Sequence, residues 1–174
     1  AASDVYKRQV QVSGLNNFTS SLEELEEQYV TYNDYHELCS YKLGFHAEYT
    51  TDKKLLEGLA GLSEKYHAPV YTHNSETKRE VEECRQRYGK SPTQLFEEMG
   101  LYRYGGGGYH CIWFDDEDID IFAKRNLSVI TNPASNLKLA SGIAPLKKMQ
   151  EAGINLAIGT DGPASNNCLD MFRE

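Results

Sequence analysis

The sequence predicts an α/β protein in which parallel β-strands alternate with α-helices. The first observation behind this prediction is a regular alternation, from residue 20 onward, of short apolar segments with segments of helical periodicity. The second observation is that glycines, prolines and helix-capping residues lie between the segments and mark where each one ends. The third is that the apolar segments are short and nearly continuous, which is typical of strands covered on both faces. This pattern implies right-handed βαβ units.

The first half of the chain contains three expected helices and two expected strands. In chain order these are a helix starting at Ser21, a strand over 41–46, a helix capped by Thr51, a strand over 68–73 and a helix from Thr77 to Gly89. The first two helices carry apolar residues three or four positions apart, which indicates one buried face each. Thr77 and Glu80 have the spacing of a capping box.

The second half continues the same pattern with more polar connections. In chain order we expect a helix from Ser91 to Gly100, a strand over 109–114, a helix capped by Asp115, a strand over 127–131, a helix over 143–152, a strand over 154–160 and the start of a helix over 169–174. The glycine run 105–108 does not fit a phosphate-binding loop, and we expect it to let backbone pass close to a ligand or loop. Residues 132–145 are expected to form a long polar loop suited to substrate binding.

Two architectures are compatible with this order of elements. One is a complete, doubly wound, five-stranded sheet. The other is part of a (β/α)8 TIM barrel, which needs about 250 residues, and a chain that ends inside a helix favours it. We expect residues 1–9 to be a non-native tag or scar segment and residues 10–174 to be a fragment of a barrel domain.

The composition narrows the function classes. A net charge of −8 disfavours binding to nucleic acid, which is usually recognised by basic patches. The apolar runs are far too short to cross a bilayer, so no membrane partner is expected. The four cysteines form no C-x-x-C pair, which suits a reducing cytoplasm and argues against a thiolate zinc site.

Polar residues gather where the expected strands end. These residues are His46, His73, His110, Asn132 and Asp161, with Glu76 one turn beyond His73. Because the carboxyl ends of parallel strands share one side of the sheet, we expect one rim to hold them all. A lone histidine at a strand end is usually structural, but three of the five histidines together with Asp161 are better explained by a site.

Zinc-dependent hydrolysis is the chemistry that such a rim favours. Imidazole and carboxylate groups are good zinc ligands, and bound zinc lowers the pKa of water to about 7. Glu76 follows His73 closely enough to act as a general acid and base beside the metal.

Four longer motifs carry a resemblance to a known family. They are THNSETKREVEECRQRYG, GYHCIWFDDEDIDIFAKRN, TNPASNLKLASGIAPLKKM and GTDGPASNNCLDMF. Together they resemble the amidohydrolase superfamily, and within it the 5'-methylthioadenosine/S-adenosylhomocysteine deaminases. The resemblance implies a zinc (β/α)8 barrel that hydrolyses the 6-amino group of an adenine nucleoside, releasing ammonia and the inosine analogue.

The resemblance also implies roles for individual residues. His73 corresponds to a metal-binding histidine, and Asp161 to an aspartate that binds the metal, contacts the substrate and acts as base. Glu76 corresponds to the glutamate that contacts the purine and shuttles the proton. His110 corresponds to the histidine that orients the hydroxide, and His46 to a substrate-contacting histidine. One zinc ion per subunit is implied.

The sequence departs from the family pattern in one important respect. It contains no H-x-H pair, which the family uses for two further metal ligands. Since His73 and Asp161 alone are too few for a tight site, we expect the isolated chain to bind zinc weakly and to be inactive. The unpaired edges of an unclosed barrel make homo-oligomers possible.

Other functions remain open at this point. Within the same class they are guanine deamination and dehalogenation of a triazine, and a different class is a non-catalytic barrel remnant. A cytidine-type deaminase is disfavoured because its P-C-x-x-C motif is absent.

Overall fold

The computed structural model describes residues 18–33, 35–38 and 40–174. The expected tag segment at residues 1–9 lies outside these residues, so its nature stays a prediction. The described residues form a single five-stranded sheet with helices between the strands, as the sequence predicts.

All neighbouring strands of the sheet are parallel, and their order in space is their order along the chain. They are β1 (Leu43–Gly44), β2 (Val70–Asn74), β3 (Gly106–His110), β4 (Ser128–Thr131) and β5 (Asn155–Ile158). A doubly wound sheet would reverse its strand order near the middle, and this sheet does not. The fold is therefore part of a (β/α)8 barrel wall, and the sheet is not closed.

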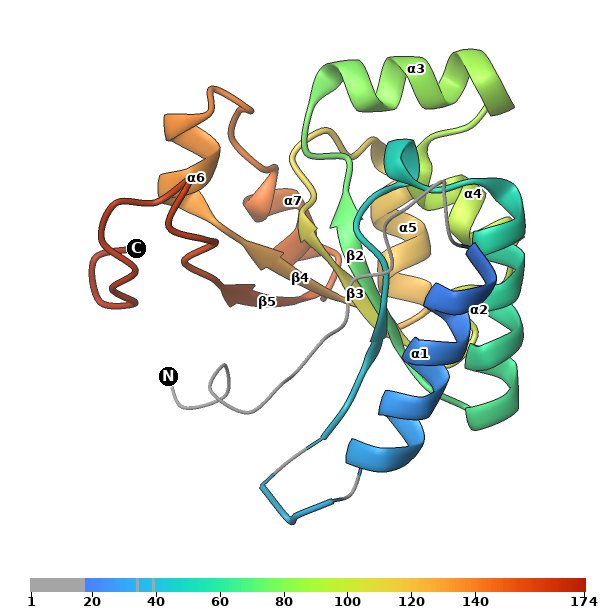
Figure 1. Cartoon of the computed structure of the whole chain (residues 1–174). Helices are drawn as coiled ribbons and strands as arrows, with labels where there is room; N and C mark the ends of the chain where they lie inside the picture. The colour runs from blue at the N-terminus through green and yellow to red at the C-terminus, as the bar shows by residue number, and fades with distance from the viewer. Residues whose placement is uncertain (1–17, 34, 39) are drawn as a thin grey trace.

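Helix α1 (Phe18–Tyr32) precedes β1, and the other helices connect consecutive strands. These are the 3-10 helix η2 (Glu48–Thr50), α2 (Lys53–Tyr66), α3 (Lys78–Tyr88), α4 (Pro92–Glu98), α5 (Asp116–Lys124), α6 (Pro133–Lys138) and α7 (Leu146–Glu151). Figure 1 shows α1 and α2 beside β1 at one end of the sheet, and α6 with the C-terminal residues at the other. Among the described helices, none is both long enough and apolar enough to span a membrane.

The two faces of the sheet differ in burial. Side chains such as Val70, Thr72 and Val129 are fully buried under the helices. Their neighbours in the alternating pattern, such as Tyr71 and Ile130, are only half-buried. The helices thus cover one face, as they do in a barrel wall, and the hydrophobic core lies between that face and the helices.

Several predicted helix ends are confirmed. The side chains of Thr77, Ser91 and Asp115 accept hydrogen bonds from the backbone N–H groups three residues later, and each marks the start of a helix. Gly89 adopts a left-handed conformation (φ 70°) after α3, which is the usual role of glycine at this position.

Other predicted helix boundaries are wrong by a few residues. The first helix begins at Phe18, so Ser21 lies inside it. Asp52, rather than Thr51, caps α2, because its carboxylate accepts the N–H of Leu55 at 2.8 Å. Residues 169–174 form turns and no helix, so the expected helix start there is also wrong.

The strand predicted at 109–114 is displaced toward the N-terminus. The glycine run itself forms most of β3, which ends at His110. A Cβ atom on Gly106 would lie 1.9 Å from the carbonyl oxygen of Val70, and one on Gly107 would lie 2.4 Å from that of Ser128. The backbone does pass close to other backbone here, as expected of glycine, but within the sheet rather than in a loop.

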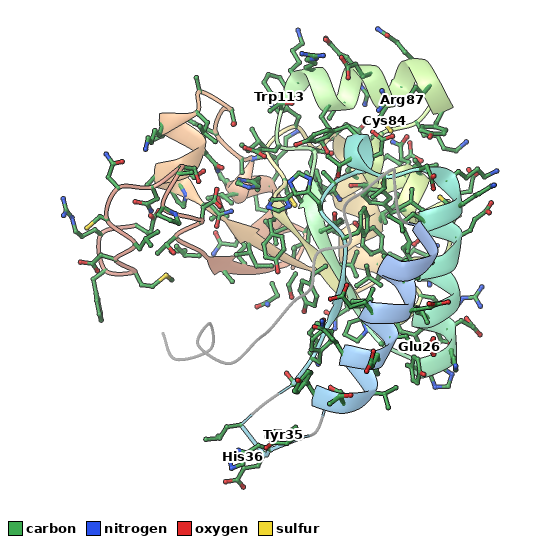
Figure 2. The ribbon with its side chains drawn as sticks, in the orientation of Figure 1. Glu26, Tyr35, His36, Cys84, Arg87 and Trp113 are labelled. Carbon is green, nitrogen blue, oxygen red and sulfur yellow. The ribbon has the colours of Figure 1, made fainter. Side chains whose placement is uncertain are left out.

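An ion pair between a buried carboxylate and an exposed guanidinium holds the segment that follows β1. Glu48 of η2 is only 2% exposed and pairs with Arg87 of α3, with 2.5 Å between Oε2 and Nη2. Figure 2 shows Arg87 and the buried Cys84 together on α3. This contact ties the loop that carries His46 to the helix that follows His73 and Glu76.

Candidate active site

The structure brings four of the predicted site residues together at the carboxyl ends of the strands. His73 lies near the end of β2, Glu76 in the turn after it, His110 at the end of β3 and Asp161 just after β5. The rings of His73 and His110 are stacked with their centres 5.6 Å apart. Nε2 of His110 lies 3.8 Å from Oε2 of Glu76 and 3.9 Å from Oδ2 of Asp161.

The backbone is unusual where these residues sit. Ser75, His110, Cys111 and Asp161 all have positive φ angles, between 51° and 68°. Residues with side chains rarely adopt this conformation, and each instance costs of the order of 1 kcal/mol or more. Such positions persist where the surrounding structure holds them, and here they turn side chains toward the rim after β2, β3 and β5.

His73 is held in a form that suits a metal ligand. Its Nδ1 lies 2.7 Å from the carbonyl oxygen of His46, so Nδ1 carries the proton and donates. Burial lowers the pKa of His73, and the contact with that carbonyl only partly opposes this effect. The ring is therefore neutral, and its Nε2 keeps a free lone pair.

His46 also reaches this group of residues. Its ring is 4.9 Å from that of His73, centre to centre, and its Nδ1 lies 2.9 Å from the hydroxyl of Thr50. The half-buried ring thus borders the rim beside His73, with one nitrogen held by η2.

Asp161 is held as a carboxylate by hydrogen bonds. Oδ2 accepts from the hydroxyl of Ser135 at 2.6 Å, and Oδ1 accepts from the N–H of Gly162 at 2.7 Å. Burial raises the pKa of Asp161, but these hydrogen bonds and the neighbouring His110 outweigh burial and leave the pKa below its usual value.

Glu76 is positioned from two directions. The hydroxyl of Ser141 donates to its Oε1 at 3.1 Å. The turn that carries it is held by the buried Glu80, whose carboxylate accepts the N–H groups of Ser75 and Glu76 at 3.1 and 2.9 Å. The predicted capping box is therefore only half right, because Thr77 caps α3 while the Glu80 carboxylate holds the turn before it.

His110 is almost completely buried, and two asparagines contact its ring. Oδ1 of Asn136 lies 2.7 Å from Nδ1. Nδ2 of Asn132 lies at nearly equal distances from both ring nitrogens, 3.4 Å from Nδ1 and 3.5 Å from Nε2.

Sequence reasoning missed three residues that contact this group: Ser135, Asn136 and Ser141. All three belong to the segment 132–145, for which the sequence predicts a substrate-binding loop but which contains helix α6. The proline at its first helical position was the available signal for a helix. No signal in the sequence indicates which of its polar side chains reach the rim.

The two other histidines lie outside the site. His67 is exposed at the end of α2, and His36 is exposed in the segment after α1. Figure 2 shows His36 at the opposite end of the molecule from α3.

Two of the described residues carry donor groups that suit a metal ion. Within them, no group of three or more histidine, cysteine, aspartate or glutamate side chains is arranged to hold an ion. The neutral His73 and the ionised Asp161 have the donor atoms that zinc prefers, so they fit a zinc site to which other ligands must contribute.

Comparisons with known proteins agree with these observations. The model of a family described as "Amidohydrolase family" matches residues 12–174. A 5-methylthioadenosine/S-adenosylhomocysteine deaminase from Caldanaerobacter subterraneus subsp. tengcongensis is 46% identical over 132 residues, which are 76% of this chain and 30% of that protein. A 5'-deoxyadenosine deaminase from Methanopyrus kandleri is 44% identical over 137 residues, 79% of this chain and 32% of that protein.

A solved structure shows the same fold. The crystal structure of an adenosine deaminase from Xanthomonas campestris with bound zinc superimposes with a TM-score of 0.81 and 34% identity, covering 97% of this chain and 39% of that one. The chain thus spans about a third of the length of the relatives that it matches.

Proposed function

The chain belongs to the amidohydrolase family, and on this premise we propose that the whole protein is a zinc-dependent aminohydrolase. Its proposed substrate is an adenosine-type nucleoside, 5'-methylthioadenosine or S-adenosylhomocysteine, which it converts to the inosine analogue and ammonia. The observation that carries the proposal is the convergence of His73, Glu76, His110 and Asp161 at one rim.

We assign the metal to His73 and Asp161. His73 offers the lone pair of Nε2, and Asp161 offers a carboxylate whose lowered pKa keeps it ionised near neutral pH. When bound, zinc would supply acidification of a water molecule. We expect one ion per subunit, with further ligands from outside the described residues.

Glu76 and His110 are the proposed proton-handling residues, together with Asp161. Glu76 would carry a proton to the purine ring from Oε2, the oxygen that faces His110. Asp161 would take a proton from the nucleophilic water at Oδ2, and His110 would orient that water through Nε2, which faces both carboxylates.

The substrate assignment rests on the relatives' names and on His46. The two relatives named above are a 5-methylthioadenosine/S-adenosylhomocysteine deaminase and a 5'-deoxyadenosine deaminase, so they share a purine nucleoside and differ at its 5' side. We propose that His46, Glu76 and Asp161 contact the nucleoside, and 5'-deoxyadenosine is the second candidate substrate.

The isolated 174-residue chain is proposed to bind zinc weakly and to lack activity. Its sequence has no H-x-H pair, and its described residues supply two suitable ligands, His73 and Asp161.

We further propose a cytoplasmic location, which the free thiols of Cys84, Cys111 and Cys168 support. We also propose that the chain self-associates through the edges of its sheet.

The proposal is tested on the complete protein that contains this chain. Zinc content is measured by elemental analysis, and ammonia release is measured with the three nucleosides above and with guanine as the comparison substrate. We expect stoichiometric zinc and the highest kcat/KM for one of the three nucleosides. A zinc-free protein that turns over none of these compounds would support the non-catalytic alternative, and a preference for guanine would reject the nucleoside assignment.

A further inference from the structure

One short segment contacts three of the candidate site residues. The hydroxyl of Ser135 donates to Asp161 at 2.6 Å, Oδ1 of Asn136 lies 2.7 Å from Nδ1 of His110, and the hydroxyl of Ser141 donates to Glu76 at 3.1 Å. The partners are separated by 26, 26 and 65 positions in the sequence. The segment 135–141 therefore links side chains that come from three different strand ends.

The segment is itself rigidly held. Ser135, Asn136 and Ser141 are at most 7% exposed. The N–H of Ser141 donates to the carbonyl of Asn136 at 2.9 Å, which closes the turn after α6. The indole Nε1 of Trp113 donates to the carbonyl of Ser141, also at 2.9 Å. Polar side chains locked in this way can fix the orientation of the groups that they contact.

Asn136 does more than hold the His110 ring in place, because it selects which ring nitrogen carries the proton. An amide oxygen can only accept a hydrogen bond, so its partner Nδ1 must be the protonated nitrogen. Nε2 then keeps its lone pair on the side that faces Glu76 and Asp161. Nδ2 of Asn132 can only donate, but it lies 3.4 and 3.5 Å from the two ring nitrogens and can serve whichever one lacks the proton, so it does not select the tautomer.

We propose that Ser135, Asn136 and Ser141 are the positioning residues of this site, and that Asn136 fixes His110 as the tautomer with its proton on Nδ1. The catalytic meaning of this inference rests on the proposed function, since an unprotonated Nε2 can accept a hydrogen bond from the nucleophilic water. The tautomer itself does not depend on that function and can be measured separately.

The direct test is nuclear magnetic resonance of the complete protein that contains this chain, labelled with ¹⁵N-histidine. Long-range ¹H–¹⁵N correlations are recorded at about pH 8, above the ordinary histidine pKa of about 6.5, and His110 is assigned from its loss in His110→Gln. We expect a protonated Nδ1 and an unprotonated Nε2. The opposite pattern in the unchanged chain would overturn the proposal without any variant.

Matched asparagine variants sharpen this test. In Asn136→Leu, the correlations of His110 should no longer show the proton on Nδ1. If the leucine variant does not fold, Asn136→Ala takes its place. Asn132→Leu removes the amide that does not discriminate, so the pattern should remain. An unchanged pattern in both Asn136 variants would reject the role of Asn136.

A second test uses the zinc-loaded complete protein. Asn136→Leu should lower kcat about 100-fold with KM changed less than about twofold, and Ser135→Ala or Ser141→Ala should lower kcat about 10-fold. Ser63→Ala is the matched control, because it removes an equally buried hydroxyl that donates to the carbonyl of Ala68, far from the rim. Equal losses in Ser63→Ala and in the three test variants would reduce their role to general stability. An inactive complete protein with the expected tautomer would reject the proposed function and leave the role of Asn136 intact.

Discussion

Two polar clusters in this molecule lie close together but are built differently. The internal cluster consists of Asn74, Thr93 and Tyr102, which are at most 1% exposed under the helices. Its members bond directly to one another, with Asn74 Nδ2 2.9 Å from the Thr93 hydroxyl and 3.0 Å from the Tyr102 hydroxyl. The internal cluster therefore satisfies its own polar atoms and joins β2 to α4 and the segment after it.

The rim cluster consists of His73, Glu76, His110 and Asp161, and its members do not bond to one another. Each is held by a separate partner. The backbone carbonyl of His46 holds His73, and the side chains of Ser141, Asn136 and Ser135 hold Glu76, His110 and Asp161, respectively. The ionisable atoms themselves remain 3.8 and 3.9 Å apart, longer than a hydrogen bond. In the rim cluster, hydrogen bonds to residues outside the cluster hold each side chain, and the ionisable atoms do not hydrogen-bond to one another. Such an arrangement suits chemistry, whereas the directly bonded internal cluster contributes to stability.

The largest effect should come from Asp161→Asn in the complete protein, because this change touches both metal binding and proton transfer. We expect kcat/KM to fall by about 10⁴-fold or more, with loss of zinc on dialysis. Steady-state ammonia release and elemental analysis measure the two effects. Normal turnover in this variant would show that Asp161 is not the general base. It would also contradict the distinction between a rim cluster that serves chemistry and an internal cluster that serves stability.

Glu76→Gln should have the next largest effect. The amide keeps the size of the side chain and its contact with Ser141 but cannot carry the proton, so kcat should fall by about 10²–10⁴-fold. Zinc content should be unchanged, and the free energy of unfolding should stay within about 0.5 kcal/mol. Loss of zinc with an unchanged rate per bound ion would instead assign Glu76 to the metal.

A third prediction concerns pH and the carboxylate that supports the rim. Burial raises the pKa of Glu80 from its ordinary 4.5 to about 7, although backbone N–H groups of Glu76, Ser75 and Thr77 oppose this. Between these values the folded chain binds a proton that the unfolded chain has released. The free energy of unfolding should therefore fall as pH rises from about 4.5 to 7, by up to about 3 kcal/mol.

Urea unfolding at a series of pH values measures this dependence. Glu80→Gln should make the fall with pH shallower over that interval, and the part that remains is expected from the buried Asp118, whose pKa burial raises from 3.8 to about 6. A stability that rises with pH in this interval, in the unchanged chain, would contradict the raised pKa.

The smallest predicted effect separates the internal cluster from the rim. Tyr102→Phe removes the hydroxyl that accepts from Asn74, and the free energy of unfolding should fall by about 1 kcal/mol. Turnover and zinc content of the complete protein should remain within about twofold. A loss of activity larger than the loss of stability would show that the two clusters are coupled.

The alternation of elements and the position of the rim could be predicted from the sequence for physical reasons. Helix starts such as Ser91 and Asp115 have local signatures that span only four residues. His73, His110 and Asp161 were recognised as neighbours because parallel strands bring their carboxyl ends to one side. The rule needs only the order of the strands, so the displaced boundary of β3 did not affect it.

The errors arose where local signals were weak or ambiguous. Gly106 and Gly107 have low strand propensity, so the prediction moved β3 to the apolar residues that follow. Helix α6 has few apolar residues with helical spacing, and Thr51 and Asp52 are both good capping residues. Contacts such as Asn136 to His110 depend on packing between distant segments, which no local pattern encodes.

The glycine-rich strand has a consequence for how the sheet assembles. Glycine loses more conformational freedom on ordering than other residues, by about 0.5–1 kcal/mol each relative to alanine, and the first three residues of β3 are glycines without side chains that could help the strand to pair. We therefore expect β3 to order only after β2 and β4 are in place on either side. His110, at its end, would then be among the last residues of the rim to reach its final position as the polypeptide folds.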